Sequence, residues 1–137
     1  MKKIFDLIEL KSIIAQEKRR QKKIILCHGV FDLIHIGHVR HFESAKKLGD
    51  ILIVSITDDS FINKGPKRPI FSSKFRSELI SSFSAVDYVV ISKKVDACEV
   101  IKNLKPNIYC KGLEYKENNK DITGNILKEV REVKSVG

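Results

Sequence analysis

Two histidines in the first third of the chain have the spacing expected of a phosphate-binding pair. His35 and His38 are three residues apart, with Gly37 between them. If a helix begins here, both imidazoles project from the same side of it. A helix N-terminus also offers free backbone N–H groups and the positive end of the helix dipole. Because Gly37 leaves room for an anion against the helix, these residues predict a site for a polyphosphate.

All four histidines of the chain lie between positions 28 and 41. A single histidine is usually a structural residue, and a His-x-x-His pair can also bind a metal ion. No clear third metal ligand stands near the pair, so a metal site is not predicted. The gathering of every histidine in one short segment favours a functional role. His41 is the histidine that we expect to be a bystander.

Four apolar runs are typical of β-strands, and the histidines follow the first of them. This first run is nearly continuous rather than alternating, as in strands that are buried on both faces of a parallel sheet. The predicted strands cover residues 24–30, 51–56, 86–91 and 108–110.

Five segments around these strands have helical spacing. The first carries apolar side chains at Phe5, Ile8, Ile13 and Ile14, as an amphipathic helix lying on the domain would. The third follows a cap at Ser72 or Ser73. The predicted helices cover residues 3–19, 36–48, 73–83, 95–104 and 122–134, and residues 64–69 are predicted to form a loop.

Strands that alternate with helices predict an α/β fold. We expect a Rossmann-like parallel sheet with helices on both faces, in one domain over residues 1–137. Ligands of such sheets bind beyond the carboxyl ends of the strands. The loop between residues 28 and 38 is therefore the first place to look for the site.

Composition narrows the function class. The formal net charge of +9 favours anionic partners, which could be nucleic acid, an acidic membrane surface or phosphorylated metabolites. No window approaches the roughly 20 apolar residues of a membrane helix, and the N-terminus does not resemble a signal peptide, so we expect a cytoplasmic protein without membrane partners. The widely spaced Cys27, Cys98 and Cys110 predict neither a disulfide framework nor a zinc site.

The segment Gly29–His38, with the sequence GVFDLIHIGH, resembles the signature of the cytidylyltransferase-like nucleotidyltransferase superfamily, the HxGH type. Further pieces of the resemblance follow in the right order along the chain. The set is most similar to the adenylyltransferase domain of bacterial ADP-heptose synthases, and the glycerol-phosphate cytidylyltransferases are a weaker match. These pieces are Leu48-Gly49-Asp50, Lys64-Gly65, Arg68-Pro69, Arg76, Val86–Val89 and Lys111-Gly112 with Tyr115.

The resemblance implies roles for individual residues. His35, His38 and Lys64 would be catalytic, with Lys67 as a substitute for Lys64, and Arg76 would bind the β- and γ-phosphates. The other residues implied at the nucleotide are Gly29, Val30, Phe31 and Asp32, which would shape its pocket, and Lys111, Gly112 and Glu114, which would lie near its base and ribose.

The implied reaction is the transfer of AMP from ATP to a sugar phosphate with release of pyrophosphate. Mg²⁺ would bridge the phosphates. The resemblance also implies a possible homodimer and a fused or partner kinase domain. A cytidylyltransferase that uses CTP and a polyol or alcohol phosphate is the alternative within the family.

Two competing hypotheses lie outside this family. A nucleic-acid-binding module would suit the positive charge, but aromatic residues make up only 7% of the chain and no known binding motif occurs, so nucleic acid is an unlikely partner. Class I aminoacyl-tRNA synthetases share the letters His-Ile-Gly-His, but they are far longer and carry further domains.

Two departures from the family pattern stand out. His28 occupies a position where heptose enzymes usually carry Asn. The family also ends with a Ser/Thr-rich motif that opens a last helix and binds phosphate, and this motif does not follow residue 134. We therefore expect a piece of a longer protein that lacks the C-terminal strand and helix.

Overall fold

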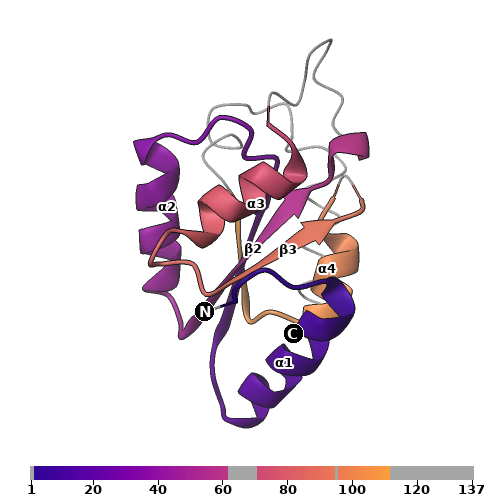
Figure 1. Cartoon of the computed structure of the whole chain (residues 1–137). Helices are drawn as coiled ribbons and strands as arrows, with labels where there is room; N and C mark the ends of the chain where they lie inside the picture. The colour runs from indigo at the N-terminus through magenta and orange to yellow at the C-terminus, as the bar shows by residue number, and fades with distance from the viewer. Residues whose placement is uncertain (1, 62–70, 95, 112–137) are drawn as a thin grey trace.

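The computed structural model describes residues 2–61, 71–94 and 96–111 (Figure 1). Helices and strands alternate along these residues as predicted. In chain order they are α1 (Leu7–Arg19), β1 (Ile24–Gly29), α2 (Ile36–Lys46), β2 (Ile51–Thr57), the short 3₁₀ helix η1 (Asp59–Phe61), α3 (Ser73–Ser81), β3 (Tyr88–Ser92), α4 (Cys98–Leu104) and β4 (Ile108–Lys111).

The four strands form one parallel sheet with the order β3-β2-β1-β4. In the register of β1, Ile25 aligns with Leu52 of β2 and with Ile108 of β4. The chain crosses from one half of the sheet to the other between β3 and β4. The central strand β1 therefore delivers its C-terminal loop to the point where the strand order reverses, which is where open α/β sheets bind ligands.

Each face of the sheet carries its own core, as predicted for a sheet with helices on both sides. Leu10 and Ile14 of α1 pack with α4 against one face, where they meet Leu26. Phe42 of α2 and α3 cover the other face (Figure 1). Neighbouring residues of β1 thus alternate between two apolar layers, and this alternation explains the continuous apolar run in the sequence.

The first helix begins later than predicted. Asp6 caps it by accepting a hydrogen bond from the backbone of Glu9, and the chain before Asp6 runs along β3 instead. There Phe5 donates its backbone N–H to Val89, and Val89 donates to Lys3. The prediction for Ile8 was also wrong, because this side chain is 84% exposed while Leu10 and Ile14 are buried.

Other boundaries differ by a few residues. β3 begins two residues later than predicted because Val86 closes a turn on Phe83 and the carboxylate of Asp87 accepts the N–H of Leu52. α4 begins three residues later, after Asp96 accepts the N–H of Cys98.

The predicted loop over 64–69 and the predicted helix over 122–134 lie outside the described residues. Within the described parts of the chain, no helix is both long and apolar enough to cross a membrane.

Candidate active site

The loop that follows β1 is held in a strained, closely packed shape. Phe31 has a φ of 52°, in the left-handed region that costs a non-glycine residue about 1–3 kcal/mol. Its ring folds back over Gly29, where a Cβ atom would lie 2.8 Å from the ring. Only glycine fits at this position without a shift. The ring of Phe31 then packs edge-on against His38 at 5.8 Å between centroids.

The two histidines form a capping box at the start of α2. His35 is the N-cap residue, and its Nδ1 accepts the N–H of Gly37 at 3.0 Å. The Nδ1 of His38 in turn accepts the N–H of His35 at 3.2 Å. The two imidazole rings lie with their centroids 4.2 Å apart. The spacing His-x-Gly-His is thus a local structural motif, and it fixes both rings relative to the helix end.

This capping determines which ring nitrogen carries the proton. An Nδ1 atom that accepts a backbone N–H cannot itself be protonated, so the neutral ring carries its proton on Nε2. His35 and His38 are thereby set up as two neighbouring Nε2–H donors. His38 is only 6% exposed, whereas His35 is exposed. An anion placed against the helix end would meet the two rings and the positive end of the helix dipole.

Asp32 ties this loop to the segment before α3. Its carboxylate accepts the N–H of Phe71 at 2.9 Å, and its side chain is buried. Asp32 therefore contributes to the shape of the loop, and a direct contact with nucleotide stays a prediction.

Arg76 enters the same region from α3 and is 1% exposed. Its guanidinium donates to the carbonyl oxygens of Phe71 (3.0 Å), Val30 (2.6 Å) and Thr57 (2.8 Å). It also pairs with the carboxylate of Asp59 at 2.6 Å. These contacts engage every nitrogen of the guanidinium with protein acceptors. The predicted contact between Arg76 and phosphates stays a prediction.

Beneath the loop lies a buried polar set to which the sequence analysis gave no role. His28 is buried, and its Nδ1 lies 3.0 Å from the Oγ of Ser55. Its Nε2 lies 3.5 Å from the Oγ1 of Thr57. One sign of this set was available in the sequence, because Ser55 and Thr57 are hydroxyl residues near the end of the otherwise apolar strand β2. They matter because the register of the sheet brings them beside His28.

The remaining predicted residues are placed only in part. Lys111 ends β4 and stands opposite His28 in the register, so the backbone of β4 reaches the same edge of the sheet as the motif loop. Lys64, Lys67, Gly112 and Glu114 lie outside the described residues.

Two of the three cysteines lie side by side on neighbouring strands of the sheet. Cys27 and Cys110 are direct partners in the register of β1 and β4, and neither forms a disulfide. A hydrogen bond from the Cys27 thiol lowers the pKa of Cys110 to about 7. The same hydrogen bond, together with burial, raises the pKa of Cys27. His41 lies beside the pair, with its Nε2 3.7 Å from the sulfur of Cys27.

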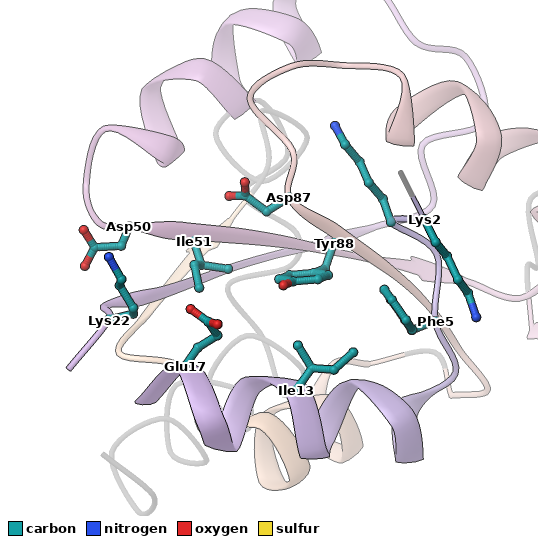
Figure 2. Close-up of a pocket in the computed structure, with 10 residues that line it drawn as sticks. Lys2, Phe5, Ile13, Glu17, Lys22, Asp50, Ile51, Asp87 and Tyr88 are labelled. Atoms are coloured by element: carbon teal, nitrogen blue, oxygen red, sulfur yellow. The ribbon is translucent and has the colours of Figure 1, made fainter. Parts of the chain in front are cut away.

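Two cavities elsewhere are poor candidates for a triphosphate. One, of about 490 Å³, opens between α1 and the amino ends of the strands, where Glu17 faces Ile51 and Tyr88 (Figure 2). It lies at the opposite edge of the sheet from the motif loop. The other, of about 660 Å³, has four carboxylates and a single lysine in its lining, which would repel a polyanion. Those charged residues are Asp6, Glu9, Asp58, Lys93 and Glu99. No group of three His, Cys, Asp or Glu side chains among the described residues could hold a metal ion.

The family model described as Cytidylyltransferase-like matches residues 26–136, which include the capped histidine pair and every element from α2 onwards. The chain belongs to this family. Its members are nucleotidyltransferase enzymes, so the donor pair at the start of α2 belongs to an enzyme of that class.

Relatives of this cytidylyltransferase-like chain include proteins named Bifunctional protein HldE. The protein of that name from a Nitratiruptor species is 42% identical over 131 residues, which are 93% of this chain and 28% of that protein. The one from Helicobacter pylori (strain J99) is 41% identical over 128 residues, 91% of this chain and 27% of that protein. The chain spans about a quarter of the length of these relatives.

A solved structure shares the fold. The lipopolysaccharide core biosynthesis protein from Thermoplasma volcanium GSS1 matches with a TM-score of 0.60 and 32% sequence identity. The match covers 72% of this chain and 85% of that one. The parallel sheet and its covering helices are therefore shared with that protein.

Proposed function

We propose that this chain transfers AMP from ATP to a sugar phosphate and releases pyrophosphate. The observation that carries the proposal is the capped pair His35 and His38, which presents two Nε2–H donors at a helix N-terminus. Phosphoryl and nucleotidyl transfers need little covalent help from the protein. They depend on alignment of two anions and on stabilisation of the charge that develops on phosphate oxygens.

In the proposed reaction, an oxygen of the acceptor phosphate attacks the α-phosphorus of ATP. The bond between this phosphorus and the oxygen that bridges to the β-phosphate breaks, and pyrophosphate leaves with that bond's electron pair. His35 and His38 donate to the triphosphate oxygens as the charge shifts. Gly29, Val30, Phe31 and Asp32 shape the floor of the nucleotide pocket.

The other residues implied by the resemblance complete the proposal. Lys64, or Lys67 in its place, contributes a cation to the phosphates, and Lys111, Gly112 and Glu114 lie near the base and ribose. We propose that Mg²⁺ enters as a complex with the triphosphate, since this ion retains several waters and binds substrate phosphates in kinase, ATPase and polymerase sites. Its chemistry would be to neutralise charge on the leaving pyrophosphate.

A sugar phosphate is the favoured acceptor because of the relatives. The solved relative is named for lipopolysaccharide core biosynthesis, and the core of a lipopolysaccharide is a chain of sugars.

The curated relatives are named bifunctional, and we propose that their second activity is a kinase that phosphorylates the sugar. The proposed setting is the cytoplasm, and a homodimer is the proposed assembly.

CTP is the second candidate nucleotide, because the matching family is named for cytidylyl transfer. Calorimetric titration of the chain with ATP and with CTP, each with Mg²⁺, separates the two. A clear preference for ATP, with pyrophosphate released on addition of a sugar 1-phosphate, is the expected result. Preference for CTP, with release on addition of a polyol phosphate, would replace the adenylyl proposal by a cytidylyl one. Binding of neither nucleotide would contradict both.

A further inference from the structure

The four acceptors of Arg76 lie in three separate segments of the chain at the edge of the candidate site. Val30 follows β1, Thr57 ends β2, Asp59 begins η1 and Phe71 precedes α3. A planar guanidinium with five N–H groups can hold such a set in one plane, which an ammonium cannot do. Arg76 therefore fixes the ends of two neighbouring strands relative to each other.

The segment most affected by these contacts is the strained loop. Arg76 holds the carbonyl of Val30, on one side of Phe31. Phe71, itself bound to Arg76 through its carbonyl, donates its N–H to Asp32 on the other side of Phe31. The positive φ of Phe31 is thus enclosed between two hydrogen bonds that both lead back to the same arginine. A conformation of this kind persists only where the surroundings enforce it.

The loop in turn positions a catalytic side chain of the proposed reaction. The ring of Phe31 packs edge-on against the buried ring of His38. A displaced Phe31 would let the His38 ring rotate away from the Nδ1 hydrogen bond that keeps its proton on Nε2. Arg76 therefore affects Nε2 of His38 indirectly, through its contact with Val30 and the packing of Phe31 on His38.

We propose that Arg76 is a positioning residue that holds the Val30–Asp32 loop and, through Phe31, the orientation and protonation of His38. The catalytic part of this proposal rests on the proposed function, and the structural part does not. The donations of Arg76 to protein acceptors leave little of the guanidinium for a direct contact with substrate. Because the guanidinium is occupied by protein acceptors, a positioning role and a role as a phosphate ligand predict different effects of substitution.

The test uses Arg76→Lys and Asp59→Asn, with Arg40→Lys as the matched control. Arg40→Lys makes the same chemical change on α2, at a position that is not buried. Arg76→Lys keeps the charge but cannot reach all four acceptors. Asp59→Asn keeps Arg76 and weakens one of its contacts, so it serves even if Arg76→Lys does not fold. Both test variants should lower kcat, Arg76→Lys by about 10- to 100-fold and Asp59→Asn by less, with the KM for nucleotide within about threefold of wild type.

A phosphate-ligand role predicts the reverse pattern. Arg76→Lys would then raise the KM for nucleotide, and Asp59→Asn, by freeing the guanidinium, would leave the KM unchanged or lower it. That pattern would overturn the proposal.

A second readout does not depend on catalysis. Nitrogen NMR of the imidazoles in the ligand-free chain reports which ring nitrogen carries the proton. We expect the His38 signals of wild type and Arg40→Lys to show the Nε2–H form, and those of both test variants to shift or broaden. Unchanged His38 signals in the test variants would overturn the proposal. If the His38 signals shift in the test variants but the wild type transfers no nucleotide, the proposed function fails and the positioning role stands.

Discussion

At the scale of single residues, the site depends on hydrogen bonds that determine protonation. The Nδ1 atoms of His35 and His38 are both occupied by backbone N–H groups, so each ring can serve as a donor only through Nε2. The sequence predicted the pair and its place at a helix end. It could not predict the contacts of His28 or Arg76, because their partners in β2 and near η1 are distant along the chain.

Two substitutions of His38 separate its two nitrogens. The amide of His38→Asn can replace Nδ1 as an acceptor but provides nothing at the position of Nε2, so we expect an intact fold and at least about a hundredfold loss of kcat. His38→Gln can place an amide N–H near Nε2 but loses the capping acceptor. It should keep more activity than the Asn variant and have a lower melting temperature. Equal turnover in wild type and His38→Asn would remove Nε2 from the mechanism.

The cysteine pair gives a pH-dependent prediction. Because the hydrogen bond from Cys27 lowers the pKa of Cys110 to about 7, the fraction of Cys110 thiolate should rise steeply through neutral pH. The thiolate is the nucleophile, so the rate of alkylation by iodoacetamide should rise over the same range. Mass spectrometry of the labelled protein should find Cys110 modified before Cys27 and Cys98, which are both buried.

Cys27→Ala is the control for this interpretation. Without the thiol donor, the alkylation profile of Cys110 should move to higher pH, towards that of an ordinary cysteine. A profile that does not move would contradict the assigned cause.

At the scale of elements, helix positions were predictable and helix ends were not. The parallel strands follow from apolar runs, but α1 begins at Leu7 because the residues before it pair with the edge of β3. A local sequence pattern could not predict that pairing, because its partner, Val89, is distant along the chain. In the helix that follows, Leu10 and Ile14 rather than Ile8 face the sheet.

A matched pair of substitutions on α1 tests this orientation. Leu10→Ala removes a fully buried side chain and should lower the free energy of unfolding by about 2–5 kcal/mol. Ile8→Ala, at an exposed position of the same helix, should change it by no more than about 0.5 kcal/mol. Urea denaturation measures both values. A large loss with Ile8→Ala would support the face expected from the sequence pattern instead.

The cap of α3 supports a similar test. The hydroxyl of Ser72 accepts the N–H of Phe75 at 3.2 Å, and α3 carries Arg76. Ser72→Ala should destabilise the fold by about 1 kcal/mol, whereas Ser72→Asp, which keeps an acceptor, should retain most of the stability. Equal losses in the two variants would argue against a capping role.

At the scale of the whole molecule, a parallel sheet with the order β3-β2-β1-β4 delivers the motif loop and the ends of β2 and β4 to one edge. The α/β class and both helical layers could be predicted because β-α alternation leaves few alternatives. The net charge of +9 agrees with anionic substrates but does not select them. The proposal of a triphosphate at this edge rests on the capped histidines, in a chain of the cytidylyltransferase-like family.

The most direct test of nucleotidyl transfer follows a label. The chain is incubated with Mg²⁺, a sugar 1-phosphate and ATP that carries ³²P on either the α- or the γ-phosphate. We expect the α-label to appear in a new sugar nucleotide and the γ-label in pyrophosphate, with both products lost in His38→Asn. Transfer of the γ-label to the sugar, or an α-labelled product that forms equally well in His38→Asn, would contradict the proposed transfer.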